Sequence, residues 1–122
     1  MSKFVIRTVK SGLKFDLRAA NGQNILTSEV YTTQAACRKG IASVKKNAPG
    51  AKLEDQTEGG WKPLSNPKYE LYRDRAGDYR FRLKARNGQI IAISENYSGR
   101  AGCLNGLESV RKNAAEAEIV EE

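Results

Sequence analysis

Hydrophobic and polar residues alternate along two separate stretches of the chain. The apolar positions are Leu13, Phe15, Leu17 and Ala19 in the first stretch and Tyr79, Phe81, Leu83 and Ala85 in the second. Alternation with a period of two predicts a β-strand with one buried face. An Asn-Gly pair follows each stretch, and this pair is a strong hairpin signal. We therefore expect a further strand at 23–28 and at 89–94, in a register that the sequence leaves open.

The two stretches belong to one internal repeat. Residues 15–48 read FDLRAANGQNILTSEVYTTQAACRKGIASVKKNA, and residues 81–114 read FRLKARNGQIIAISENYSGRAGCLNGLESVRKNA, aligned without a gap. After the third strand of each copy, apolar residues recur at helical spacing and predict a helix with one buried face. This face comprises Cys37, Gly40, Ile41, Val44 and Ala48 in the first copy and Cys103, Gly106, Leu107, Val110 and Ala114 in the second.

Both predicted helices carry the same signals at their ends and in their interior. Thr32 and Ser98 are the expected N-caps. Asn47 and Asn113 are expected to leave the helices in the left-handed conformation. A glycine inside a helix costs about 1 kcal/mol relative to alanine, so its presence in both copies predicts that each helix lies close against the sheet.

The first strand of each copy is expected to pair with the second. The pairs are Phe4 with Leu17 and Ile6 with Phe15 in one copy, and Tyr69 with Leu83 and Leu71 with Phe81 in the other. This register leaves Lys10-Ser11 as one loop and Arg75-Ala76-Gly77 as the other, with glycine where a three-residue hairpin loop needs a left-handed residue. Short strands at 51–55 and 117–121 complete two β-β-β-α-β units.

These elements predict an α+β fold, in which a tandem duplication forms one antiparallel-rich sheet with two helices packed on one side. Residues 1–122 form a single domain, with repeat 1 at 3–56, a linker at 57–68 and repeat 2 at 69–122. A repeat of this size is marginally stable alone, so we expect the two to pack about a pseudo-twofold axis. Trp61, the single tryptophan, either anchors the glycine- and proline-rich linker or stacks on a ligand.

The whole pattern, F-x-I…F-x-L-x-A-x-NGQ-x-I…SE-x-Y…C-x-x-G-I-x-SV-K-x-NA, resembles the YegP-like family of small uncharacterised bacterial proteins. The resemblance covers essentially the whole chain, and its NGQ and SE-x-Y blocks occur twice. It implies a β-β-β-α-β unit that is either duplicated or dimerised into one continuous sheet. It implies no established activity, and therefore no catalytic residues.

The composition adds a formal net charge of +7, which favours attraction to polyanions. The chain contains no histidine, the commonest general base and metal ligand. No stretch is apolar enough for a signal peptide or a membrane span, so we expect a cytoplasmic monomer without membrane contact. We expect no catalytic site, metal or cofactor.

Two repeated features could carry chemistry but have simpler interpretations. Glu29 and Glu95 each stand between a serine and a tyrosine, where they could bind a polar ligand or accept hydrogen bonds near the following helix N-terminus. Cys37 and Cys103 lie on the apolar helix faces, where free cysteine behaves as a small hydrophobic residue. Neither has the C-x-x-C context of a redox site.

Basic residues alternate with the core positions of the second strands and should project from the uncovered face of the sheet. The candidate anion-binding residues are Arg7, Lys14, Arg18, Tyr72, Arg80, Arg82, Lys84 and Arg86. Structural contacts would account for part of this row, because Glu70 should face Arg82 and Tyr72 should face Arg80 across the hairpin. A continuous basic face favours a nucleic-acid or polyanion partner, whereas a face broken by ion pairs favours a structural or protein-interaction domain.

Overall fold

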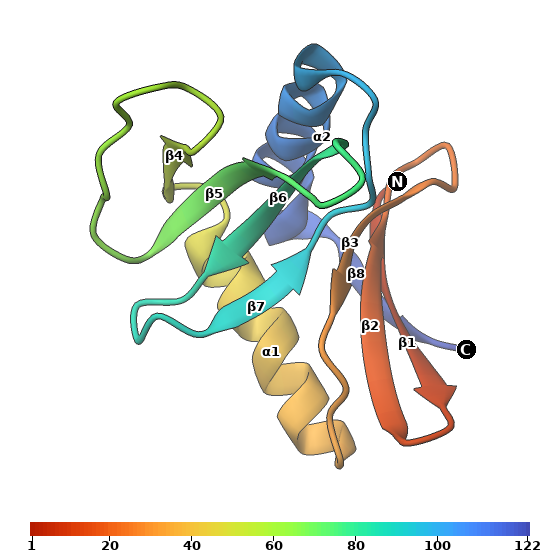
Figure 1. The fold of residues 1–122 in the computed structure, drawn as a ribbon. Helices are drawn as coiled ribbons and strands as arrows, with labels where there is room; N and C mark the ends of the chain where they lie inside the picture. The colour runs from red at the N-terminus through yellow and green to blue at the C-terminus, as the bar shows by residue number, and fades with distance from the viewer.

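The computed structural model describes residues 1–122. The first repeat forms β1 (Lys3–Val9), β2 (Gly12–Arg18), β3 (Asn24–Ser28), α1 (Gln34–Asn47) and β4 (Lys52–Asp55). The second forms β5 (Lys68–Arg73), β6 (Tyr79–Lys84), β7 (Ile90–Ile93), α2 (Arg100–Asn113), a 3₁₀ turn η1 (Ala114–Glu116) and β8 (Glu118–Glu121). All strands join one mixed sheet in the order β4-β5-β6-β7-β3-β2-β1-β8. Both helices lie on one side of it (Figure 1), which confirms the predicted α+β fold class.

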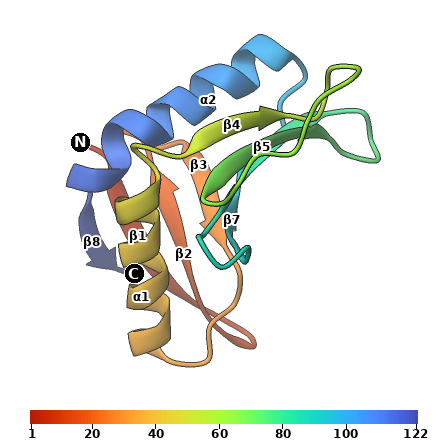
Figure 2. The same cartoon turned by 90° about the vertical axis from the view of Figure 1, so that its left-hand side faces the viewer.

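The two halves of the sheet meet at β3 and β7. These strands pair antiparallel through Thr27 with Ile93 and Ser28 with Ala92, so equivalent strands face each other at the centre. This is the pseudo-twofold arrangement expected from the repeat. Figure 2 shows α1 and α2 crossing on the same face of the sheet. Neither helix has the length and apolar composition needed to cross a lipid bilayer.

The last strand of each repeat is exchanged with the other repeat. β4 follows α1 in the chain but pairs in parallel with β5, through Lys52 with Lys68. In the same way β8 pairs with β1, through Glu118 with Lys3. The units at 3–56 and 69–122 are therefore repeats of sequence. In the structure, each half of the sheet is completed by the last strand of the other repeat.

The predicted hairpin registers are confirmed. Phe4 pairs with Leu17 and Ile6 with Phe15, as do Tyr69 with Leu83 and Leu71 with Phe81. Gly77 has a φ of 87° and so supplies the left-handed residue of its loop. The sequence leaves open the register in which the third strand pairs with the second. A β-bulge in each second strand, after Leu17 and after Leu83, shifts this register partway along the pair.

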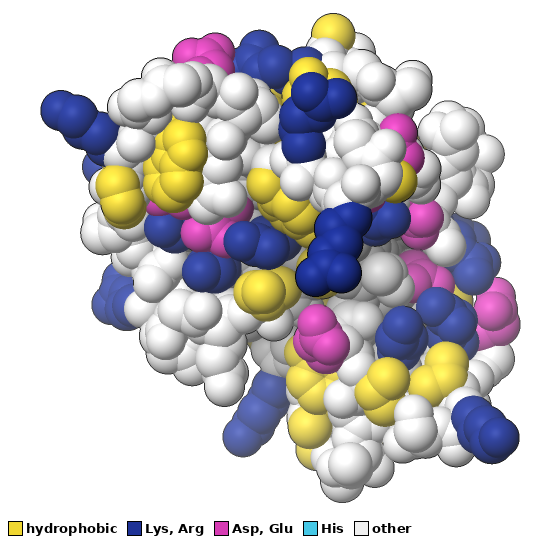
Figure 3. All heavy atoms as spheres, viewed as in Figure 1, with side chains coloured by type: hydrophobic (Ala, Val, Ile, Leu, Met, Phe, Trp, Pro, Cys, Tyr) yellow, Lys and Arg dark blue, Asp and Glu magenta, His cyan; other side chains and the backbone are white.

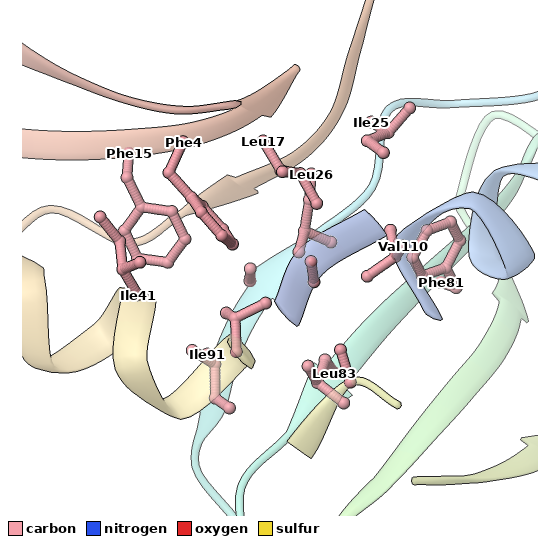
Figure 4. Packing of buried hydrophobic residues seen from close by; sticks show 14 of the residues in the cluster. Phe4, Phe15, Leu17, Ile25, Leu26, Ile41, Phe81, Leu83, Ile91 and Val110 are labelled. Atoms are coloured by element: carbon pink, nitrogen blue, oxygen red, sulfur yellow. The ribbon is translucent and has the colours of Figure 1, made fainter. Parts of the chain in front are cut away.

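The hydrophobic core fills the space between the sheet and the helices. Its ring contacts include Phe4 with Phe15, edge to face at 5.8 Å between centroids, and Tyr69 with Phe81 at 6.1 Å. Figure 4 shows core side chains from both halves of the sheet beside Ile41 of α1 and Val110 of α2. Tyr69 is fully buried, and its hydroxyl donates to the carbonyl of Ala48 at 2.7 Å.

The predicted N-caps of both helices are wrong by one residue, and the conformation predicted for their C-terminal asparagines is also wrong. Tyr31 pairs with Leu13 through two backbone hydrogen bonds, which keeps the chain extended, so α1 begins later. Its N-cap is Thr33, whose Oγ1 accepts from the amide of Ala36 at 3.1 Å, and the corresponding residue of α2 is Gly99 rather than Ser98.

The helices also end differently from the prediction, because no non-glycine residue has a positive φ. Ala48 and Ala114 continue the right-handed conformation at the two C-caps. Asn47 instead uses its side-chain amide to donate to the carbonyl of Ser43 at 2.9 Å, and Asn113 does the same to Ser109.

Trp61 does not anchor the linker, since it remains 43% exposed. The linker is held through Leu64, whose amide donates to Glu54 Oε1 at 2.7 Å. The carbonyl of Leu64 in turn accepts from Lys68 Nζ at 3.1 Å. Polar contacts therefore take the place of the predicted aromatic anchor.

Candidate nucleic-acid interface

The face of the sheet opposite the helices carries mixed charges rather than a continuous basic surface. Figure 3 views this face and shows Lys and Arg side chains interspersed with acidic and apolar ones. Register brings residues of successive strands into one row across the sheet. This row runs Val5, Asp16, Thr27, Ile93, Arg82, Glu70 and Glu54. Three of its members are carboxylates.

All three carboxylates of this row are buried beneath basic side chains. Asp16 is 1% exposed and accepts from Arg7 Nε at 2.8 Å and from Thr27 Oγ1 at 2.6 Å. Arg7 itself is about one third exposed. The base therefore meets the solvent, while the acid below it neutralises much of its field.

Glu54, Lys68 and Glu70 form a buried ionic cluster in the second half of the sheet. Lys68 Nζ lies 2.7 Å from Glu54 Oε1 and 3.3 Å from Glu70 Oε2. Burial acts to raise the pKa of Glu54, but hydrogen bonds from Lys68, Gln56 and the Leu64 amide outweigh it and hold that pKa at about 2. Burial likewise acts to raise the pKa of Glu70, but Arg82, Lys84 and Lys68 hold it below its usual value. These acids are therefore charged at neutral pH.

Most of the predicted basic residues are engaged by acidic groups. Arg82 Nε donates to Glu70 Oε1 at 2.6 Å, and Lys84 Nζ lies 3.3 Å from the same carboxylate. Arg80 and Arg18 pair with Asp74 at 2.8 Å and with Glu122 at 3.2 Å. Among the predicted bases that lie on this face, Lys14 alone lacks an acidic partner.

The pairings predicted for this hairpin are confirmed in register, but the aromatic contact involves a different arginine. Glu70 faces Arg82 and Tyr72 faces Arg80. The guanidinium over the Tyr72 ring, at 4.4 Å from its centroid, is nevertheless that of Arg82. Arg80 is turned away by its ion pair with Asp74. Tyr72 is therefore covered on one side by Arg82.

Arg86 does not lie on this face, so the predicted row of four bases is wrong at its end. β6 stops at Lys84 after the bulge, and Arg86 stands in the following turn. It lines a cavity of about 370 Å³ together with residues of α1. The lining residues are Lys39, Ser43, Lys46, Asn47, Ala85, Arg86 and Asn87.

Lys39 and Lys46 were not among the predicted site residues. A signal for them exists in the sequence, because α1 contains Arg38, Lys39, Lys45 and Lys46 and no acidic residue. What the sequence does not reveal is that α1 packs beside the hairpin of the other repeat. Lys39, Lys46 and Arg86 take part in none of the ion pairs of the structure.

The serine of the repeated Ser-Glu-x-Tyr motif has a structural role. Ser28 Oγ accepts from the amide of Phe15 at 2.9 Å and donates to the carbonyl of Glu29 at 2.7 Å. Ser94 makes the equivalent contacts in the second repeat. The carboxylates of Glu29 and Glu95 are exposed and form no hydrogen bond or ion pair, so they do not cap the helices that follow.

Both cysteines are buried core residues, as expected. Each is 0% exposed, and they are not joined in a disulfide. Burial raises the pKa of both thiols, that of Cys103 to about 11. Both thiols are therefore protonated at neutral pH and have little nucleophilic character.

Three comparisons place this fold among known proteins. The chain matches the family described as "Domain of unknown function (DUF1508)" over residues 12–55 and 74–121. The UPF0339 protein YegP of Yersinia pestis is 36% identical over 114 residues, which cover 93% of this chain and 88% of the relative. A UPF0339 protein of Treponema denticola is 57% identical over 54 residues, which cover 44% of this chain but 93% of the relative. The solution NMR structure of yegP from E. coli aligns with a TM-score of 0.81 and 31% identity, covering 99% of this chain and 92% of that chain.

Proposed function

The chain belongs to the DUF1508 family of UPF0339 proteins, which confirms the resemblance to YegP-like proteins, and we propose that it is a non-catalytic module that binds nucleic acid. The observation that carries the proposal is the distribution of its unpaired cations. The sheet-face arginines are matched by acids, whereas α1 carries four bases and no acid. Arg38 is paired with Glu121, so Lys39, Lys45 and Lys46 provide the unpaired positive charge of α1, to which a polyanion would be attracted.

The expected binding is weak and independent of sequence. Lys and Arg that neutralise phosphates release bound counterions, and this accounts for nearly all non-specific affinity. No motif in the chain reads base edges, so dissociation constants on the order of 10⁻⁴–10⁻⁶ M are expected at physiological salt. Of the predicted sheet-face residues, Lys14 should contribute directly, and the paired arginines should contribute less. We place this activity in a cytoplasmic monomer.

A second candidate function is protein interaction through the sheet face. The observation that favours it is the ion-paired face itself, together with the exposed side chains of Trp61 (43%) and Leu64 (37%) on the linker. Aromatic residues and arginine are enriched at protein interfaces. A partner would then contact Tyr72, Arg82 and the linker.

Affinity purification with and without nuclease treatment separates the two candidates. The first predicts that RNA or DNA co-purifies with the tagged protein at low salt and that nuclease removes both the nucleic acid and any proteins carried with it. The second predicts defined protein partners that survive nuclease and are lost in Trp61→Ala. Absence of nucleic acid at low salt would overturn the proposed function.

A further inference from the structure

A groove runs along α1, between this helix and the hairpin turn that joins β6 to β7. One cavity, of about 370 Å³, contains Lys39, Lys46 and Arg86. A second, of about 380 Å³, shares Lys39, Ser43, Ala85 and Asn87 with the first and continues toward Tyr31. Because the two cavities share these residues, they form one continuous groove built from the helix of repeat 1 and the hairpin of repeat 2.

One end of the groove is strongly cationic. Lys39 and Lys46 are two helical turns apart, so they lie on the same side of α1 about 10 Å from each other. Arg86 stands across from them on the hairpin. No acidic residue lines either cavity. Three unpaired bases around one hollow form a site for a multiply charged anion, since arginine also binds phosphate through two parallel hydrogen bonds.

The other end of the groove is apolar and aromatic. It is lined by Tyr31, Ala36, Gly40, Ile90 and Ile91, with the side-chain amides of Asn87 and Gln89 at its edge. A flat ring fits against such a surface, and amides can hydrogen-bond its polar edges. The combination of a phosphate end and a ring end is the chemistry of a nucleoside phosphate.

The fold does not require two of these three charges, as the internal repeat shows. In the aligned repeats, Asn105 stands where α1 has Lys39, and Ala20 stands where the second hairpin has Arg86. Both helices nonetheless span the same length and end at equivalent residues. Lys39 and Arg86 are therefore specific to this groove, whereas Lys46 is matched by Lys112 in the last turn of α2.

We propose that this groove binds a nucleoside phosphate unit, with its phosphate held by Lys39, Lys46 and Arg86 and its ring against Tyr31 and Ile90. The inference rests on the proposed function and deepens it by assigning the site. The unit comes either from a single strand of nucleic acid or from a free nucleotide, and both sources share this chemistry.

The test uses the full-length protein and two probes, a short fluorescein-labelled oligothymidylate and adenosine 5′-diphosphate. The variant Lys39→Asn/Arg86→Ala installs the residues of the other repeat at both positions, so folding is expected to survive. The control variant Lys10→Asn/Arg75→Ala removes the same charge from exposed loops elsewhere. Fluorescence anisotropy and two-dimensional NMR shifts measure binding at low salt.

We expect the groove variant to lose oligothymidylate affinity about tenfold and the control about twofold or less. Shifts of the Asn87, Gly88 and Gln89 amides should accompany binding of either probe. If the wild type binds the oligothymidylate and the groove variant binds equally well, or if the control loses as much, the groove is the wrong site and the proposed function stands. If the wild type binds only the diphosphate, the groove is confirmed with a free nucleotide as its ligand and the proposed function fails. Binding of neither probe overturns both.

Discussion

Tyr97 lies with its phenol oxygen against the backbone of Gly106, in the middle of α2. Tyr31 has the same relation to Gly40 in α1. A Cβ on either glycine would overlap the tyrosine hydroxyl and approach Cζ within 2.8 Å at Gly106 and 2.7 Å at Gly40. Each helix therefore accepts the cost of an interior glycine because the tyrosine of the preceding Ser-Glu-x-Tyr motif needs the space.

Gly106→Ala should lower the free energy of unfolding by about 2 kcal/mol, because the ring of Tyr97 must move out of its packed position. Adding Tyr97→Phe should recover part of this loss by removing the hydroxyl. Gly102→Ala in the same helix is the control. Its Cβ would meet Tyr97 Cδ1 at an ordinary 3.6 Å, so helix propensity should stabilise the protein by up to about 1 kcal/mol. Urea denaturation that gives both alanine variants the same sign would contradict this packing.

The same glycines show how far the sequence predicts the fold. Their recurrence in both repeats predicts a close contact with the sheet, and Phe15 of β2 does lie 3.0 Å from the Cβ position at Gly40, but the nearest atoms at both glycines are those of a tyrosine ring. The hairpin registers are predictable because alternation and turn length are local properties. The helix ends are not, because the pairing of Tyr31 with Leu13 delays α1.

The positions of the basic residues are likewise predictable from the sequence only in part. Alternation correctly predicts that Glu70 faces Arg82 across the hairpin. Alternation cannot predict the bulge after Leu83, which ends the strand and leaves Arg86 beside α1. The groove itself depends on how the two repeats pack, which is a long-range property that no local pattern encodes.

Glu54 should make stability fall as the pH drops. Its folded pKa of about 2 lies below the ordinary value of 4.5, so its contribution is complete above about pH 4.5 and is lost as the pH falls toward 2. Glu54→Gln should lower the free energy of unfolding at neutral pH by about 3 kcal/mol, because it leaves Lys68 buried with a weaker partner. The difference between variant and wild type should shrink toward zero near pH 2.

Lys68→Met added to Glu54→Gln provides the control for this cluster. An apolar replacement removes the buried charge that the single variant leaves behind, so stability should return in part. Thermal unfolding between pH 2 and 7 measures both effects. A stability gap between wild type and Glu54→Gln that persists unchanged at pH 2 would show that the carboxylate contributes by packing rather than by charge.

The exchange of β4 and β8 predicts that neither repeat folds alone as a monomer. Residues 66–122 include β5 without its partner β4, and β8 without its partner β1. This fragment should be unfolded when dilute and should form a homodimer when concentrated, as its own β8 takes the place of β4. The Treponema denticola relative, of which 54 matched residues cover 93%, has about the length of one repeat.

Sedimentation and circular dichroism of the fragment measure this behaviour. Mixing residues 1–65 with residues 66–122 should restore the eight-stranded sheet and give a heterodimer. A fragment that sediments as a folded monomer at low concentration would show that one repeat can close its own sheet and that the exchange is dispensable.

The dependence of oligonucleotide affinity on salt tests the central claim most directly, because it counts the phosphates that the protein neutralises. Each contact with a single strand should change the slope of log K against log salt concentration by about −0.7. The one phosphate held by Lys39, Lys46 and Arg86 contributes about −0.7, so the slope for Lys39→Asn/Arg86→Ala should be shallower than that of the wild type by about 0.7. No binding at low salt, or an affinity that does not change with salt, would contradict the assignment of this protein as a phosphate-contacting nucleic-acid module.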